Sequence, residues 1–266
     1  MTESQGQGTE TATRVADVLL LFTDGPDSLG VTAIARSLDL SKAVVHRILQ
    51  TLVDRRLLVS DPASRGYQLG PAAAALGARA LRESQLRTVA IPFLRELQRA
   101  TGETTTVSAL VHGGRVYLDQ VESTREIKMT VEVGRRFPLH AGSSSTCILA
   151  FLPPYEQDAV LAGELPALTE RTVTDPDVLR KRLADIRDVG HAGSDGERQE
   201  GAGSVAAPVF GVDGAVIGAI SVCGPAARVD AAARERYVPL LKTTADQISR
   251  ALGWSGGLPP DPRVTA

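Results

Sequence analysis

The stretch VTAIARSLDLSKAVVHRILQTL, residues 31–52, predicts the fold of the first part of the chain. It indicates two short helices joined by a tight turn at residues 39–41, because Ser41 can accept a hydrogen bond from a backbone N–H group in the first turn of the second helix. In that second helix, apolar residues recur at i, i+3, i+4 and i+7, a spacing that places them on one face. The residues with this spacing, which we expect in a core, are Val45, Ile48, Leu49 and Leu52.

The rest of this helix carries side chains that suit the major groove of DNA. Arg and Gln can form two hydrogen bonds with a base edge, and the methyl group of Ala can contact that of thymine. The alternative is an ordinary helical hairpin with a solvated, charged face. Under the DNA-binding hypothesis, the contacts are expected from Ser41, Lys42, Ala43, Val44, His46, Arg47, Gln50 and Thr51.

The residues after the second helix favour the DNA-binding hypothesis. Residues 57–59 and 67–69 flank a polar turn, and this pattern predicts a β-hairpin, the wing of a winged helix-turn-helix. Arg65, near the tip of the wing, is expected to reach a phosphate or the minor groove. Between residues 36 and 82 there are eight Lys or Arg and three Asp or Glu, although the formal net charge of the chain is −2. A local excess of positive charge is typical of proteins that bind a polyanion.

Length and composition indicate an ordinary globular protein with two domains. A chain of 266 residues can bury two separate cores, and a hydrophobic content of 43% with 23% charged residues is usual for soluble proteins. We find no membrane-spanning run and no signal pattern, so a cytoplasmic protein with no membrane partner is expected. The two cysteines, Cys147 and Cys223, belong to no C-x-x-C and have no suitably spaced histidine. We therefore expect no metal, no cofactor and no required disulfide.

We divide the chain into three parts. These are a winged helix-turn-helix domain (residues 12–70), a linker helix (71–85), and an effector-binding and oligomerisation domain (86–254). In the first part, a helix over residues 14–23 capped by Thr13 is expected. In the last part, neighbouring strands joined by hairpins and helices gathered at the ends predict an antiparallel α+β fold. Helices are expected at 88–100, 143–151, 155–162, 176–189 and 231–252, and strands at 104–111, 115–121, 127–133, 204–210 and 215–223.

Two motifs in the second half carry a resemblance to a known family. They are GRRFPLHA, residues 134–141, and residues 205–225, which contain VAAPVF and GAISVCGP. With the winged helix-turn-helix and the helical linker, they make residues 12–252 similar to the IclR family of bacterial transcriptional regulators. The resemblance implies a GAF-like effector-binding domain, a homodimer or dimer of dimers, and binding to a palindromic operator in double-stranded DNA. It also implies a ligand-responsive regulator, a repressor of a catabolic operon, that senses a small organic acid.

The resemblance also places an effector pocket on this chain. Residues 143–146 support it independently, because the N-terminus of a helix favours carboxylates. The structural alternative is a plain helix cap and a half-buried strand. By motif position, the effector-binding residues are Met129, Phe137, Ser143, Ser144, Ser194, Ala202, Ser204, Ser221 and Cys223.

Departures from the family pattern bear on the effector. Ser194 stands where the family usually has an acidic residue, with Asp195 next to it, and this disfavours glyoxylate and pyruvate. Ala202 opens one wall and Phe137 can stack on a ring, so an aromatic carboxylic acid is expected, with an aliphatic catabolite as the alternative. We expect Glu197 and Arg198 either to pair or to order the loop over the pocket.

Two other functions are weighed against a ligand-gated regulator. His140, residues 143–145 and Cys147 lie close together, which suggests a Ser or Cys hydrolase. The chain lacks a G-x-S-x-G elbow and an orienting carboxylate, so no catalytic residue is expected and the protein is not predicted to be an enzyme. The second alternative is a constitutive DNA-binding protein whose C-terminal domain only dimerises.

Overall fold

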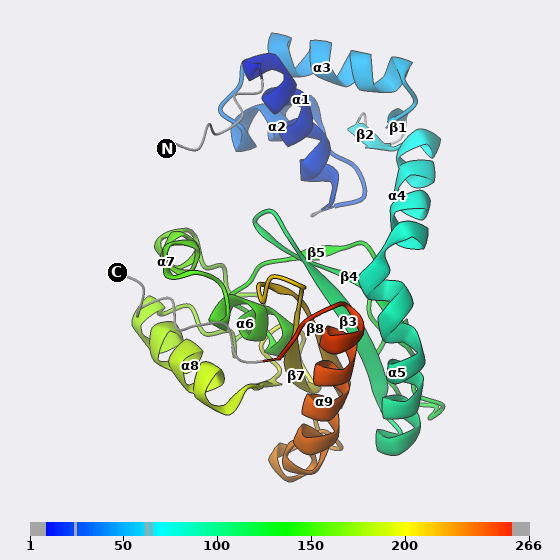
Figure 1. The fold of residues 1–266 in the computed structure, drawn as a ribbon. Helices are drawn as coiled ribbons and strands as arrows, with labels where there is room; N and C mark the ends of the chain where they lie inside the picture. Colours follow the sequence, from blue (N-terminus) through cyan, green and yellow to red (C-terminus); the bar gives the residue numbers. More distant parts are fainter. Residues whose placement is uncertain (1–8, 24–25, 62–63, 65, 257–266) are drawn as a thin grey trace. The chain divides into compact units, whose positions relative to one another are not determined.

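The computed structural model describes residues 9–23, 26–61, 64 and 66–256 (Figure 1). Arg65, the expected wing-tip contact, therefore lies outside the described residues. The chain divides into two compact units, residues 1–83 and residues 84–266. Among the helices of the described ranges, none combines the length and the apolar character needed to cross a membrane.

The first unit is a three-helix core followed by a hairpin and a further helix. Val18 of the first helix, Ile34 of the second, and Val45 and Leu49 of the third pack together in its centre, so the predicted apolar face is confirmed. Leu58 of the hairpin joins the same core. The elements are α1 (Glu10–Leu20), the 3-10 helix η1 (Leu21–Thr23), α2 (Val31–Ser37), α3 (Lys42–Asp54), β1 (Leu58–Asp61), β2 (Gly66–Leu69) and α4 (Pro71–Glu83).

Caps explain where the helices of this unit begin. The Ser41 hydroxyl accepts the Val44 N–H at 3.3 Å, as expected for the start of α3. The prediction for the first helix was wrong, because Thr9, and not Thr13, is its N-cap and accepts the Ala12 N–H. Both threonines can cap a helix, and the four extra residues place Glu10 in the first turn, where its charge complements the helix dipole.

The second unit contains a six-stranded antiparallel sheet with strand order β5-β4-β3-β8-β7-β6. Helices α5 and α9 lie side by side against one face, and α6 and α8 pack on the other face (Figure 1). The predicted α+β fold with an antiparallel sheet is confirmed. The elements are α5 (Gln85–Thr101), β3 (Thr104–Val111), β4 (Gly114–Val121), β5 (Arg136–Phe137), α6 (Ser143–Ala150), α7 (Pro154–Ala162), α8 (Pro176–Val189), β6 (Ala192–Asp195), β7 (Ala202–Phe210), β8 (Val216–Pro225) and α9 (Ala231–Ala251).

The strand predicted at residues 127–133 is not formed. Side chains bond the backbone of this segment in place of a neighbouring strand: the Gln120 amide donates to the Val131 carbonyl (3.0 Å) and accepts the Val131 N–H (2.8 Å), and the Thr104 hydroxyl donates to the Met129 carbonyl (2.7 Å). Val131 is nevertheless buried, in a small cluster with Tyr117 and Phe137. Val131, one of the apolar residues that suggested a strand, thus packs against these two rings instead of joining the sheet.

Two edge strands were not predicted. β5 has two residues and β6 has four, so neither is long enough to show a clear alternation of apolar and polar residues. β6 pairs with β7 in the register Ser194↔Ser204. This pairing brings together two residues that the motif comparison assigned to one pocket.

Candidate functional site

Helix α3 presents most of the residues expected to contact DNA to solvent. Ile48 and Leu52 are buried and Val44 is half-buried against the same core, so Val44 has only part of its side chain available. The other predicted contacts in the described part of this unit are exposed; they are Ser41, Lys42, Ala43, His46, Arg47, Gln50 and Thr51.

The exposed polar side chains of α3 differ in whether they already form hydrogen bonds within the protein. The Gln50 amide donates to Asp54 at 3.3 Å, and the Thr51 hydroxyl donates to the Arg47 carbonyl at 3.0 Å. The Arg47 guanidinium has no hydrogen bond or ion pair with any residue that the structure describes. Arg47 is therefore the side chain of this face with the most unused donors.

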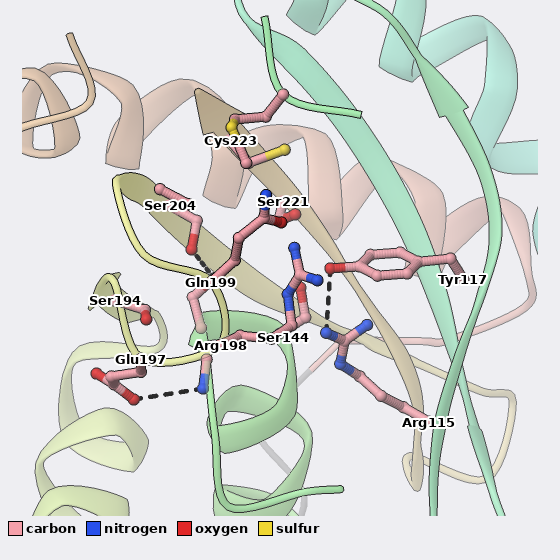
Figure 2. Close-up of a pocket in the computed structure, with 14 residues that line it drawn as sticks. Arg115, Tyr117, Ser144, Ser194, Glu197, Arg198, Gln199, Ser204, Ser221 and Cys223 are labelled. Atoms are coloured by element: carbon pink, nitrogen blue, oxygen red, sulfur yellow. Dashed lines mark hydrogen bonds between the residues drawn. The ribbon is translucent and has the colours of Figure 1, made fainter. Parts of the chain in front are cut away.

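In the second unit, a cavity lies between the N-terminus of α6, strands β4, β7 and β8, and the loop at residues 196–201 (Figure 2). All of the expected effector-binding residues except Phe137 line it: Met129, Ser143, Ser144, Ser194, Ala202, Ser204, Ser221 and Cys223. The chain segments that contribute them are far apart in the sequence. The lining residues that were not among the predicted contacts are Arg115, Tyr117, Gly142, Glu197, Arg198 and Gln199.

Phe137 was expected to form a wall, but it does not line the cavity. Its ring packs edge-to-face on Tyr117, with 5.5 Å between the ring centroids. The guanidinium carbon of Arg198 lies 4.9 Å from the Phe137 centroid, and that of Arg115 lies 5.2 Å from it. Phe137 thus supports the side chains that face the cavity.

The cavity wall is rich in hydroxyl groups. The Ser143 and Ser204 hydroxyls are 2.8 Å apart, and the Ser221 hydroxyl is 2.7 Å from that of Thr106. Ser144 and Ser194 are only 3% and 6% exposed, and their hydroxyls have no hydrogen-bond partner among the described residues. Both residues line the cavity, so these two hydroxyls are available to a ligand.

The N-terminus of α6 adds backbone donors to this wall. The first helical hydrogen bond of α6 runs from the Thr146 N–H to the Gly142 carbonyl (3.0 Å), so the N–H groups of residues 143–145 have no partner within the helix. Gly142 has a φ of 87°, which favours glycine, and it offers no side chain to cap these groups. Unpaired N–H groups at a helix N-terminus attract anions.

Arg115 is the main charged group of the cavity. It is only 1% exposed, and its guanidinium donates to three neutral oxygens: the Ser145 hydroxyl (2.8 Å), the Ser108 hydroxyl (3.0 Å) and the Tyr117 hydroxyl (3.1 Å; Figure 2). Burial lowers the pKa of Arg115, and the nearby charge of Arg198 lowers it further. A guanidinium nevertheless stays protonated in proteins, so this site holds a buried positive charge.

The carboxylates near the cavity are already paired with other arginines. Glu197 forms an ion pair with Arg182 at 2.8 Å and accepts the Gly142 N–H at 3.3 Å, so the expected pairing of Glu197 with Arg198 is not formed. Asp195 forms an ion pair with Arg171 at 3.3 Å. Arg115 and Arg198 are therefore left without a carboxylate among the described residues.

The remaining titratable groups near the cavity are Glu103 and Cys223. Glu103, close to Cys223, is buried and forms two hydrogen bonds with Arg228, at 2.7 and 2.9 Å. Burial raises the pKa of the Cys223 thiol to about 12 and raises that of Cys147 as well. Such thiols are protonated at neutral pH and are poor nucleophiles.

The arrangement expected of a hydrolase is not formed at His140. Its Nε2 lies 2.9 Å from the Pro166 carbonyl oxygen, and within the described ranges the His140 ring forms no hydrogen bond with a serine or a cysteine. The same ranges contain no cluster of three or more side chains suited to hold a metal ion.

Comparison with known proteins connects the exposed helix and the cavity to one family. Residues 11–62 match the IclR helix-turn-helix domain, and residues 78–250 match the C-terminal domain of the bacterial transcriptional regulator IclR. The chain belongs to the IclR family. IclR-family proteins are transcriptional regulators and not enzymes. This chain binds DNA through its helix-turn-helix domain, and its C-terminal domain is an effector domain.

Individual relatives agree with this assignment. The HTH-type transcriptional regulator KdgR of Escherichia coli is 33% identical over 227 residues, which cover 85% of this chain and 86% of the relative. An IclR-family crystal structure from Silicibacter sp. TM1040 has a TM-score of 0.82 and 30% identity, and it covers 94% of this chain and 98% of that one. An IclR homologue from Microbacterium hydrocarbonoxydans, solved in complex with 4-hydroxybenzoate, has a TM-score of 0.66 and 29% identity, and covers 91% of this chain and 99% of its own.

Arg115, which lines the cavity, was not among the residues carried over from the IclR family by motif. A signal for it was present, because Arg115 and Tyr117 are two positions apart on the predicted strand and must therefore share a face. That face is the one turned to α6, since Arg115 bonds Ser145. The alternation of side chains along β4 thus indicates that Arg115 and Tyr117 lie on the same, buried face of the sheet.

Proposed function

We propose that this IclR-family protein is a ligand-responsive regulator, a repressor of a catabolic operon, whose effector is a small organic acid bound in the cavity. The observation that carries the proposal is the buried charge of Arg115, which has three neutral partners and no carboxylate among the described residues. An uncompensated buried charge costs several kcal/mol, and the carboxylate of a ligand would remove much of that cost.

The other groups of the cavity suit the same ligand. The N–H groups at the start of α6 and the hydroxyls of Ser144 and Ser194 can donate to carboxylate oxygens, and Tyr117 offers an aromatic edge. The relative bound to 4-hydroxybenzoate supports an aromatic carboxylic acid, with an aliphatic acid as the second candidate.

Binding such an acid requires the cavity to open. Its free volume is about 30 Å³, which suffices for water but not for an aromatic ring. The loop at residues 196–201 carries Arg198 and Gln199 over the cavity and has glycines with positive φ at both ends, Gly196 (77°) and Gly201 (72°). Movement of this loop is the change by which an acid would favour one conformation over another.

On the DNA side, we propose that a homodimer or dimer of dimers binds a palindromic operator in cytoplasmic double-stranded DNA. Two α3 helices would then read two half-sites related by the symmetry of the dimer. The effector would alter operator affinity by binding one arrangement of the dimer better than another, and the operator would affect acid binding by the same factor.

The first test is a thermal-shift screen of the purified protein against aromatic and short aliphatic acids. A ligand that binds only the native state raises the melting temperature by mass action. The best acid is then added to a titration of the DNA upstream of the gene. A shift in melting together with a change in DNA affinity is expected. Specific DNA binding that no acid alters would instead support a constitutive regulator.

Arg47→Ala is expected to weaken operator binding by about 1–3 kcal/mol if Arg47 hydrogen-bonds a guanine. The measurement is a titration of wild-type and variant proteins against the operator and against copies with single base changes. Arg55→Ala is the matched control, because Arg55 is exposed but lies at the far end of α3. An unchanged sequence preference in Arg47→Ala would contradict the base-reading role.

The double substitution Ser204→Ala with Ser221→Ala is expected to lower acid affinity at least tenfold. Each hydrogen bond from a hydroxyl to a charged group contributes about 1.5–3 kcal/mol, and both hydroxyls line the cavity. Calorimetric titration with the acid found in the screen measures the change. Thr244→Ala is the control, since the Thr244 hydroxyl bonds the Leu240 carbonyl within α9. Equal affinity in the double variant and the control would exclude these hydroxyls from the binding site.

A further inference from the structure

The cavity has a second positive group that the binding of a single carboxylate leaves unused. Arg198 lines the cavity on the side of the 196–201 loop, whereas Arg115 reaches it from β4 (Figure 2). Both stand by the same aromatic ring, with their guanidinium carbons 4.3 Å (Arg115) and 5.8 Å (Arg198) from the Tyr117 centroid. Two like charges over one ring repel each other, and the charge of Arg198 is among the causes that lower the pKa of Arg115.

Among the residues that the structure describes, the acidic side chains near this pair are bound to other arginines. Glu197, the carboxylate of the cavity lining, is held by Arg182 at 2.8 Å and by the Gly142 N–H. Asp195, three residues before Arg198, pairs with Arg171, and Glu103 pairs with Arg228. Within the described ranges, Arg198 has neither an ion pair nor a hydrogen bond.

We propose that the effector carries two carboxylates, one held by Arg115 and the hydroxyls at the start of α6, and the other held by Arg198. This inference rests on the proposed function, and it specifies how many carboxylates the organic acid carries. A monocarboxylate would balance only one of the two guanidiniums. Arginine suits both ends, because its planar fork of donors matches a carboxylate.

The placement of the two arginines assigns them different roles. Arg115 is buried, bonded to three oxygens and therefore preorganised, so its guanidinium need not move to bind the first carboxylate once the loop has opened. Arg198 is half-buried on a loop whose ends are glycines with positive φ, so it can follow the second carboxylate. The second carboxylate would thereby fix the loop, and loop closure would depend on the double charge of the ligand.

The test compares dicarboxylates with their monoamides, which have nearly the same shape but one charge less. The probes are the straight-chain acids from succinate to adipate and the three benzene dicarboxylates, each with its monoamide, and inorganic phosphate as a compact anion. Affinities are measured by calorimetric titration of the full-length protein. We expect at least one dicarboxylate to bind tenfold or more tightly than its monoamide.

Arg198→Gln should remove this preference, because it should weaken the binding of the dicarboxylate far more than that of the monoamide. Arg135→Gln is the matched control, because the Arg135 guanidinium also lies over the Phe137 ring, at 5.2 Å, but does not line the cavity. The control should keep the wild-type preference. Arg198 is half-buried and has no polar partner among the described residues, so both variants are expected to fold, which circular dichroism verifies.

Three results would overturn the proposal. If monocarboxylates bind as tightly as dicarboxylates, the second carboxylate has no partner and the inference fails, while the organic-acid function stands. If Arg198→Gln weakens dicarboxylates and monoamides alike, Arg198 acts on the loop and not on a second charge. If phosphate binds but neither class of organic acid does, both this inference and the proposed effector class are wrong.

Discussion

Arg115→Gln is expected to lower the affinity for the acid effector about 10- to 100-fold, the largest loss from any single substitution in the cavity. A hydrogen bond to a charged group contributes about 1.5–3 kcal/mol, and every 1.4 kcal/mol is tenfold in affinity. Arg115 offers the ligand its charge in a buried place, where water screens it little. Calorimetric titration and the loss of the acid-induced rise in melting temperature measure the effect.

We expect the Arg115→Gln variant to fold, for two reasons. Glutamine keeps an amide donor near the position of the Arg115 Nε, which now bonds the Ser145 hydroxyl. The substitution also removes a buried charge that has no carboxylate among the described residues, which offsets part of the lost hydrogen bonding.

Arg115→Lys is the control for charge, since it keeps the positive group but loses the planar fork. It should retain more acid affinity than Arg115→Gln. A glutamine variant that melts as a folded protein and binds the acid as tightly as the wild type would show that the effector site lies elsewhere.

Leu49→Ala is expected to destabilise the DNA-binding unit by about 2–5 kcal/mol and to leave the effector unit intact. Leu49 is fully buried in the core of the first unit, together with Val18, Ile34 and Leu58, and a leucine-to-alanine change in such a place removes buried surface and leaves a cavity. The two units have separate cores. Specific DNA binding should therefore fail at a lower temperature while acid binding persists.

Differential scanning calorimetry with and without acid tests this result. The variant should show an early transition that the acid does not shift and a later one that it does, because a ligand stabilises the unit that it binds. Leu76→Ala is the control, since Leu76 on α4 is 61% exposed and its truncation removes little buried surface. A single transition, with acid affinity lost together with DNA binding, would contradict independent cores.

Much of the fold could be predicted from local patterns. The i, i+3, i+4, i+7 spacing identified the buried face of α3, and Ser41 identified its first turn. The bounds of β3 and α8 agree with the predicted ranges, because the β-branched residues of β3, and Asp175 with Pro176 at the start of α8, are signals that act locally. The error at the first helix has the same origin, since Thr9 and Thr13 offer the same local signal.

The motif resemblance added what local patterns lack. It brought Ser143, Ser204 and Ser221 into one predicted pocket, although Ser143 and Ser204 are 61 residues apart in the chain and 2.8 Å apart between hydroxyls. It did not identify Arg115, whose role depends on what surrounds it.

The sequence by itself therefore determined the helices, most of the strands, the exposed face of α3 and the family, because periodicity, caps and motifs are properties of neighbouring residues. Only the tertiary structure decided which charges are paired. Glu197 bonds Arg182 across the fold and not its neighbour Arg198, and Gln120 bonds Val131 in place of a strand. Such pairings depend on which distant segments share a buried space. The low polarity of that space raises the free-energy cost of a charge such as that of Arg115, which has no carboxylate partner among the described residues.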